Sequence, residues 1–244
     1  MGSTKKILIS QQRPSGVAAY EAIEKKYDVS IDFVPFFTIE SLSSREFRTQ
    51  RINLTDYTAV VFSSRHAIDA FFNLCNDLRV KTPETMKYFC TTEAIAMYLQ
   101  KHIVYRKRKI FFGDGTPSSV VALIGSKHNG EKFLITTRYE ALTRLFDEKK
   151  LNYSTGTFVK NVSCDLKGIR LSSYDLIVLY NPSDITSLYE NFPDFKQEDI
   201  KFISFGKGIV KAMEEAGLTI TVKAPAPGIP SAVSAIEAYL EPNK

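Results

Sequence analysis

Small hydroxyl residues, glycines and cationic side chains recur where short apolar runs of this sequence end. Ser63-Ser64-Arg65 follows the run AVVF, and Gly206-Lys207 follows the run KFISF. The short polar segments that follow other apolar runs contain Thr92, Arg138, Asn181 and Ser183. Hydroxyl, guanidinium and ammonium groups, together with free backbone N–H groups at a helix start, bind carboxylates and phosphates. These residues are therefore candidate contacts for an anionic small molecule.

No pattern in the sequence identifies covalent, metal or cofactor chemistry. The three histidines pair with no cysteine at zinc-ligand spacing, and no HExxH, CxxC or Ser–His–Asp order is present. Gly206-Lys207-Gly208 lacks the surrounding GxxxxGK[ST] of a phosphate-binding loop, so a simple strand-to-helix turn is favoured there. We expect no cofactor and no metal, and the sequence assigns no catalytic residue.

Composition and charge are those of an ordinary globular protein. The chain has 244 residues, 44% hydrophobic and 24% charged, with a net charge of +5. No apolar run approaches the roughly 20 residues of a membrane helix, the N-terminus has no secretory pattern, and the odd count of three cysteines indicates reduced thiols. We expect a cytoplasmic protein with no membrane partner. The basic run 105–109 is interpreted as a solvated face and not as a nucleic-acid site.

The chain contains an internal duplication. YTAVVFSSRHAIDAFF at Tyr57 resembles YDLIVLYNPSDITSLY at Tyr174, an offset of 117. KYFCTTEAIAMYL at Lys87 resembles KFISFGKGIVKAM at Lys201, and PSSVVALI at Pro117 resembles PSAVSAIE at Pro230, with offsets of 114 and 113. Chance similarity between apolar segments rarely keeps such a register, so three units occur twice in the same order.

Each repeated unit has the pattern of a buried strand followed by a helix. Ser63, Ser64, Thr92, Ser183 and Ser231 stand where helix N-caps are expected. A strand–helix–strand opening precedes each triplet, with strands at 5–12 and 29–37 and again at 131–138 and 153–162. The sequence predicts two similar α/β domains with doubly wound parallel sheets. It leaves open which opening completes which triplet.

The carboxyl ends of the strands are the expected place for a ligand. In open α/β sheets, ligands bind beyond these ends, where helix N-termini converge. Because two such domains are expected, the natural position of the site is a cleft between them. An anionic ligand fits the positive ends of the helix dipoles.

The duplicated units and their turns resemble the uroporphyrinogen-III synthase family over essentially the whole chain. The best-matching stretches are AVVFSSRHAI from Ala59, YDLIVLYNPS from Tyr174, and KFISFG from Lys201. The resemblance implies two flavodoxin-like domains joined by a two-stranded ladder. It groups residues 1–36 with 164–244 and places 38–161 in the other domain.

The resemblance also implies an activity. Members of the family close linear hydroxymethylbilane into an asymmetric macrocycle, inverting ring D and losing water, on the route to haem and related tetrapyrroles. They use no metal or organic cofactor. The small-molecule substrate carries eight carboxylates, which suits the candidate contacts above. We expect a monomer that binds no nucleic acid.

Several family positions differ in this chain. Val159 stands where the family usually has a tyrosine, and Lys207-Gly208-Ile209 stands where Pro-Thr-Thr is common. Asn181-Pro182-Ser183-Asp184 replaces the usual Ser-Pro-Ser-Gly. Substitute proton donors are sought among Tyr139, Tyr153 and Tyr180.

Three other functions remain as alternative hypotheses. The first is a catalytically impaired homologue that binds a tetrapyrrole or another anion without turnover. The second is a two-lobed solute-binding or regulatory domain, for which the sequence contains neither a secretion signal nor a fused effector. The third is a nucleotide-binding enzyme, which no glycine fingerprint supports.

Overall fold

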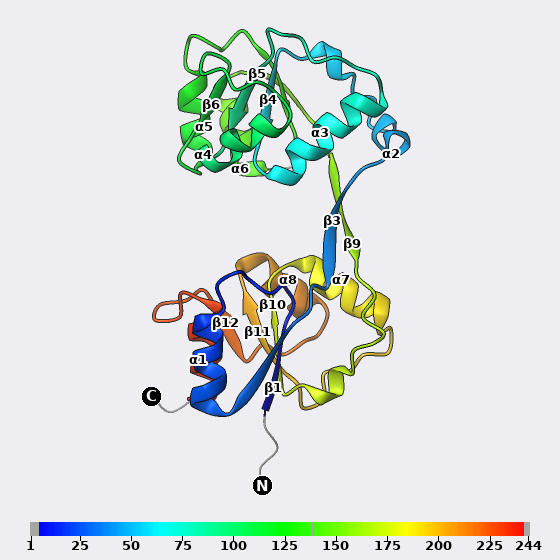
Figure 1. The fold of residues 1–244 in the computed structure, drawn as a ribbon, viewed down its shortest axis with the longest axis vertical. Coiled ribbons are helices and arrows are strands. Elements are labelled where there is room, and N and C mark those ends of the chain that lie inside the picture. The colour runs from blue at the N-terminus through cyan, green and yellow to red at the C-terminus, as the bar shows by residue number, and fades with distance from the viewer. Residues whose placement is uncertain (1–4, 138, 242–244) are drawn as a thin grey trace. The chain divides into compact units, whose positions relative to one another are not determined.

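The computed structural model describes residues 5–137 and 139–241, which fold into two compact units (Figure 1). Unit 1 takes its described residues from Met1–Thr38 and Asn161–Lys244, and unit 2 is Ile39–Lys160. Unit 1 is therefore built from two distant parts of the chain, and unit 2 from one continuous part.

Unit 1 contains a five-stranded parallel sheet in the order β12-β11-β10-β1-β2. Its strands are β1 (Lys5–Ile9), β2 (Val29–Phe33), β10 (Leu176–Leu179), β11 (Lys201–Phe205) and β12 (Val222–Ala224). Helices α1 (Ala18–Tyr27) and α9 (Ala232–Leu240) pack on one face, and α7 (Pro182–Asn191) and α8 (Lys207–Glu215) on the other. Strands covered on both faces are uniformly apolar, as LIVL of β10 is.

Unit 2 repeats this architecture with a sheet in the order β6-β5-β4-β7-β8. Its strands are β4 (Ala59–Phe62), β5 (Lys87–Cys90), β6 (Ile110–Phe112), β7 (Lys132–Ile135) and β8 (Asn152–Thr155). Helices α3 (Arg65–Asp77) and α4 (Glu93–Tyr98) pack on one face, and α5 (Pro117–Ile124) and α6 (Glu140–Glu148) on the other. Unit 2 also contains the short helices α2 (Ser44–Arg48), η1 (Leu54–Asp56) and η2 (Leu99–Lys101), and unit 1 contains η3 (Leu171–Ser173).

The two sheets have the same strand order when the duplicated units are aligned. β10, β11 and β12 correspond to β4, β5 and β6, while β1 and β2 correspond to β7 and β8. In unit 1 the opening pair of strands precedes the triplet along the chain, which is the flavodoxin-like order, whereas in unit 2 the triplet β4–β6 precedes the pair β7–β8. The predicted fold class, a duplicated pair of doubly wound parallel sheets, is confirmed.

Two strands, β3 (Phe37–Ser41) and β9 (Val159–Ser163), form a separate two-stranded sheet where the chain passes between the units. At its ends, Leu42 N donates to Phe158 O at 2.9 Å and Cys164 N donates to Phe36 O at 2.8 Å. The end of β3 thus pairs with the start of β9, and the start of β3 with the end of β9, so the two strands are antiparallel. The two-stranded ladder is confirmed.

The long strands expected at 29–37 and 153–162 are wrong, because each is divided into two strands. β2 ends at Phe33, shortly before Pro35, and β8 ends at Thr155, before Gly156. Proline has no N–H for a sheet ladder. Gly156 leaves room for a tight approach, since a Cβ there would lie 2.9 Å from Phe158 Cε2.

Side-chain caps fix most of the helix starts that the sequence predicted. Ala67 N donates to Ser64 Oγ at 3.1 Å, Ile95 N donates to Thr92 Oγ1 at 3.4 Å, and Ser234 N donates to Ser231 Oγ at 3.1 Å. The predicted cap at Ser183 is wrong, because the N-cap of α7 is Asn181. Pro182 takes the first helical position, which suits its fixed φ.

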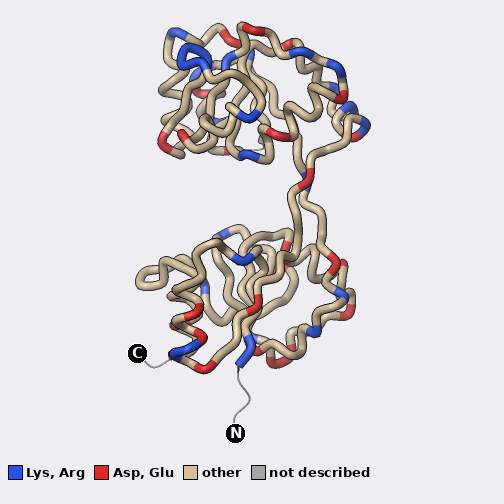
Figure 2. Tube along the Cα trace, in the orientation of Figure 1, with Lys and Arg blue, Asp and Glu red and all other residues tan. Residues whose placement is uncertain are grey.

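Lys and Arg are interspersed with Asp and Glu along both units (Figure 2). Within residues 5–137 and 139–241, none of the helices has both the length and the apolar character that spanning a bilayer requires. The described part of the chain contains no group of three or more His, Cys, Asp or Glu side chains suited to a metal ion.

Candidate functional site

The carboxyl ends of β4 and β5 in unit 2 carry hydroxyl groups with uncommitted protons. Ser64 Oγ and Thr92 Oγ1 each accept a backbone N–H as helix caps and donate to no described residue. Ser63 is half-buried, and its hydroxyl makes no hydrogen bond with a described residue. These three hydroxyl groups can donate to carboxylate oxygens of a ligand.

Arg65 lies beside these hydroxyl groups as the first residue of α3. Its side chain is exposed and forms no ion pair with any residue that the structure describes. Its guanidinium carbon lies 5.4 Å from the centre of the Tyr98 ring, which is a cation–π contact. The contact restrains the cation without neutralising it, so its charge remains available for an anion.

In unit 1, the start of α8 presents backbone N–H groups without a side-chain cap. Gly206 is the N-cap with φ +119°, a conformation that L side chains rarely adopt, and its N–H donates to Ala224 O at 2.7 Å. The N–H groups of Lys207, Gly208 and Ile209 have no intrahelical acceptor, as in the first turn of any α-helix. The Lys207 side chain is exposed and makes no ion pair with a described residue. Positive charge therefore gathers at this end of α8.

The start of α7 differs, because its own side chains occupy it. Asp184 is fully buried, and its Oδ2 accepts from Tyr180 N at 2.8 Å, Asn181 N at 3.0 Å and Ser10 Oγ at 2.8 Å. Asn181 Oδ1 accepts from Ser183 N at 2.9 Å. What remains for a ligand is the Asn181 amide N–H₂ and the hydroxyl proton of Ser183.

Asp184 does not face solvent, so it presents no exposed negative charge to a ligand. Burial raises its pKa, although the hydrogen bonds from Tyr180, Asn181 and Ser10 oppose that shift. The second carboxyl oxygen, Oδ1, is buried and has no partner among the described residues.

The substitute proton donors lie in different environments. Tyr153 donates to Asp147 at 2.9 Å and pairs with Phe133 on β7, two residues before the carboxyl end of that strand. Tyr180 follows β10 directly, but burial and the neighbouring Tyr20 raise its pKa. Tyr139 is half-buried at the start of α6, and Arg138 lies outside the described residues. Val159 is partly buried and packs against the core of unit 2.

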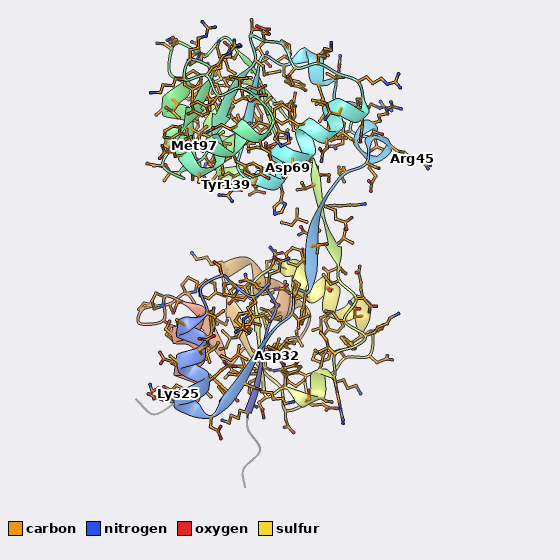
Figure 3. All side chains as sticks on the ribbon, viewed as in Figure 1. Lys25, Asp32, Arg45, Asp69, Met97 and Tyr139 are labelled. Atoms are coloured by element: carbon orange, nitrogen blue, oxygen red, sulfur yellow. The ribbon has the colours of Figure 1, made fainter. Side chains whose placement is uncertain are left out.

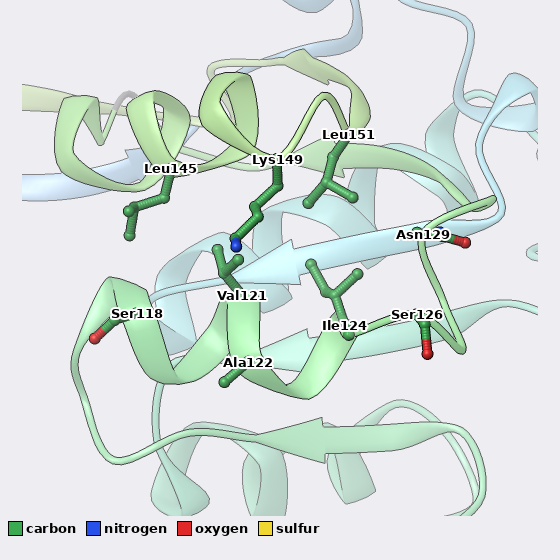
Figure 4. A pocket seen from close by; sticks show the side chains of 10 residues that line it. Ser118, Val121, Ala122, Ile124, Ser126, Asn129, Leu145, Lys149 and Leu151 are labelled. Carbon is green, nitrogen blue, oxygen red and sulfur yellow. The ribbon is translucent and has the colours of Figure 1, made fainter.

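One cavity of unit 2 lies away from all of these residues. It has a volume of about 550 Å³ and lies between α5 and α6 (Figure 4). Val121, Ile124, Leu145 and Leu151 form its apolar walls, and Lys149 reaches across them. Val121, Ile124 and Leu145 lie in the second halves of α5 and α6, Lys149 and Leu151 follow α6, and none of them is a predicted contact. A smaller cavity of about 260 Å³ in unit 1 is lined by Ser183, Asn161 and Glu190, among others.

Sequence reasoning missed a polar cluster that surrounds Asp69 in unit 2. Tyr98 donates to Asp69 Oδ2 at 2.7 Å, and His102 Nε2 lies 2.7 Å from Asp69 Oδ1. Lys101 lies 3.4 Å from the same Oδ1. The available signal was the spacing of Arg65 and Asp69, which puts both on one face of α3. The position of the second helix beside them could not be read from the sequence.

Comparison with protein families identifies this chain. The family model of uroporphyrinogen-III synthase HemD matches residues 19–234. The chain belongs to this family. The predicted resemblance to uroporphyrinogen-III synthases is confirmed. A search of curated proteins finds no match.

Solved structures of uroporphyrinogen-III synthases share the fold. The enzyme of Helicobacter pylori superposes with a TM-score of 0.56 at 14% identity, covering 98% of this chain and 100% of that one. A mutant enzyme of Thermus thermophilus superposes with a TM-score of 0.52 at 14% identity, with 97% of each chain covered. At this identity, the likeness carries the fold alone.

Proposed function

We propose that this protein is an active uroporphyrinogen-III synthase, a lyase that cyclises hydroxymethylbilane with inversion of ring D and loss of water. The observation that carries the proposal is the family match over residues 19–234, which includes the first repeated triplet and all but the last residues of the second. In this proposal the protein acts as a cytoplasmic monomer on a linear tetrapyrrole, without a cofactor, in tetrapyrrole and haem biosynthesis.

The groups at the strand ends support a ligand rich in carboxylates. Hydroxyl protons of Ser63, Ser64 and Thr92 are uncommitted, and Arg65 is an unpaired cation beside them. The first turn of α8 adds free N–H groups and the ammonium group of Lys207. Each group suits a carboxylate better than a neutral or cationic ligand.

Holding the substrate in one conformation is a large part of the catalytic task. The reactive azafulvene closes without inversion unless its chain is restrained, and several fixed contacts lower that entropic cost. We propose that Ser63, Ser64, Arg65, Thr92 and Arg138 supply these contacts from one set of strand ends. The contacts proposed at the strand ends of unit 1 are Asn181, Ser183, Gly206 and Lys207.

A second candidate is a homologue that binds tetrapyrroles without turnover. Val159 cannot donate a proton, and Lys207-Gly208-Ile209 lacks both hydroxyl groups of the usual turn. These two departures motivate the alternative. It shares the anionic ligand with the first proposal and differs only in the chemical step.

The test is a coupled assay in which hydroxymethylbilane is generated in situ, the protein is added, and the oxidised uroporphyrin isomers are separated by chromatography. Isomer III in excess over the spontaneous isomer I supports the synthase. If only isomer I forms, the synthase proposal fails. Binding of uroporphyrin III by such a protein would then support the second candidate.

A further inference from the structure

The Asp69 cluster, formed by Asp69, Tyr98, Lys101 and His102, is a polar group of unit 2 whose members are not among the proposed contacts. Asp69 lies on α3, one helical turn after Arg65, and Figure 3 shows it at the end of unit 2 where Met97 also lies. Met97 is 47% exposed, so this part of α4 is open to solvent. Arg65, which begins α3 directly after the turn that follows β4, contacts the Tyr98 ring, so the cluster adjoins the proposed contacts at the end of β4.

Tyr98 is the central donor of the cluster. Its hydroxyl donates to Asp69 Oδ2 at 2.7 Å and accepts from Lys101 Nζ at 3.0 Å. Arg65 lies over the face of the same ring, with 5.4 Å from its guanidinium carbon to the ring centre. The phenol is thus held between one carboxylate and two cations.

Two cations, Lys101 and Arg65, lie beside the Tyr98 phenol and attract the tyrosinate that forms when its proton has left. Partial burial alone raises the pKa of Asp69, but the hydrogen bonds from Tyr98, His102 and Lys101 outweigh this and hold that pKa below its ordinary value. Asp69 is therefore ionised and balances one of the two cations. The other cation is left to stabilise a tyrosinate, since opposite charges a few ångströms apart attract strongly at a partly buried site.

His102 fixes the carboxylate from the other side. Its Nε2 lies 2.7 Å from Asp69 Oδ1, and its ring stacks on Phe72 with 4.7 Å between centres and 8° between planes. Only 16% of the His102 side chain is exposed. This packing holds Asp69, and through Asp69 the Tyr98 hydroxyl, in one place.

We propose that Tyr98 gives the proton to the departing hydroxide, and that Asp69 and His102 are positioning residues for its hydroxyl group. The inference rests on the proposed synthase function. It supplies the donor that Val159 cannot provide.

The proposed step balances in atoms and charge. The C–O bond of the hydroxymethyl group breaks with its electron pair on oxygen, and the Tyr98 proton converts the departing hydroxide to water. As the C–O bond breaks, the lone pair of the pyrrole nitrogen moves into the ring and converts the pyrrole to an azafulvenium ion. Tyr98 becomes a tyrosinate beside Lys101 and Arg65. The azafulvenium carbon first bonds to the α-carbon of ring D that already carries the bridge to its neighbour. That bridge bond then breaks, which leaves a second azafulvenium ion, and the unsubstituted α-carbon of ring D closes onto it. This carbon loses a proton, which returns to Tyr98.

The decisive variant is Tyr98→Phe, because it keeps the ring, its packing and its contact with Arg65. We expect kcat for isomer III to fall about 100-fold, the scale of a lost general acid, while the affinity for uroporphyrin III changes less than about twofold. Tyr174→Phe is the matched control. Tyr174 also donates to an aspartate, Asp32, at 2.9 Å, but it belongs to unit 1 and is none of the proposed contacts. The kcat of Tyr174→Phe should remain unchanged.

Asp69→Asn separates positioning from folding. An asparagine oxygen still accepts from Tyr98, so we expect a smaller fall in kcat, about tenfold, with no further loss when Asp69→Asn is added to Tyr98→Phe. A purely structural role would make the two losses additive and would lower the thermal stability in parallel. Lys101→Met, at a side chain that is 59% exposed, tests the same step without disturbing the core and should also lower kcat.

The outcomes distinguish this inference from the function on which it rests. If the wild-type protein forms no excess of isomer III, the synthase proposal fails and the inference falls with it. If wild type forms isomer III and Tyr98→Phe retains its kcat within about threefold, the inference alone is overturned. A loss of kcat in Tyr180→Phe in place of Tyr98→Phe would assign the proton to Tyr180.

Discussion

Ser10 and Asp184, which lie 174 positions apart in sequence, are joined by a buried hydrogen bond of 2.8 Å from Ser10 Oγ to Asp184 Oδ2. Ser10 directly follows β1 in the N-terminal opening, and Asp184 lies in the first turn of α7 in the C-terminal triplet. The bond thus joins the two distant parts of the chain that make unit 1. It also occupies the N-terminus of α7 with a side chain of the protein itself.

Removing the Asp184 carboxyl group should destabilise unit 1. Asp184→Ala leaves the Ser10 hydroxyl and the N–H groups of Tyr180 and Asn181 without an acceptor in a buried place. We expect a loss of about 3 kcal/mol in the free energy of unfolding, measured by urea titration. Ser183→Ala, one residue earlier in α7, is the control. An equal loss of stability in that variant would contradict the claim that the Asp184 carboxylate stabilises unit 1.

Asp184 should also make stability depend on pH. Burial raises its pKa above the ordinary value of 3.8, so the native state holds this proton more tightly than the unfolded chain does. The stabilisation is present below that ordinary pKa and is lost as pH rises through the folded-state pKa. Asp184→Asn has no such proton, so its free energy of unfolding relative to wild type should increase as the pH rises above the ordinary pKa of 3.8. A constant difference would mean that Asp184 titrates normally.

Gly156 should not tolerate a side chain. A Cβ there would lie 2.9 Å from Phe158 Cε2 and 3.0 Å from Ile52 Cδ1, which is closer than carbon atoms pack. Gly156→Ala should lower the free energy of unfolding by about 1–3 kcal/mol. Gly130→Ala meets nothing within 4 Å, so it should change stability by less than about 1 kcal/mol. Thermal melts of both variants provide the comparison, and equal melting temperatures would refute the steric argument.

Lys207 should contribute to ligand binding through its charge. In Lys207→Ala we expect weaker binding of uroporphyrin III, with a larger loss at low than at high ionic strength. Lys211→Ala is the matched control, because Lys211 lies one turn later on α8 and its Nζ is 3.7 Å from Glu215. Fluorescence titration at two salt concentrations measures both. Equal effects of the two variants would mean that only the net charge of the protein matters.

The fold was largely predictable from the sequence because its two halves repeat the same local physics. Apolar strands followed by capped helices are local features, and the nearly constant offset between the repeats indicated their order. The divisions at Pro35 and Gly156 were missed because β-branched and aromatic residues continue on both sides of each break. The Tyr98–Asp69 pair was missed because it depends on how α4 packs against α3, which no local pattern contains.

The position of Asp184 shows why a family pattern alone can mislead. In sequence, an acid near a proposed anion site suggests repulsion of the substrate. In the structure, the same carboxyl group is buried and bound by Ser10 and two backbone N–H groups. Burial and partners, which a single sequence does not reveal, decide whether a charge faces a ligand.

The most direct measurement is the ratio of uroporphyrin isomer III to isomer I as increasing amounts of this protein are added to a constant supply of hydroxymethylbilane. An active synthase predicts that the ratio rises with protein concentration until isomer III is nearly the sole product. A ratio that stays at the value of the protein-free reaction at every concentration would contradict the proposed function.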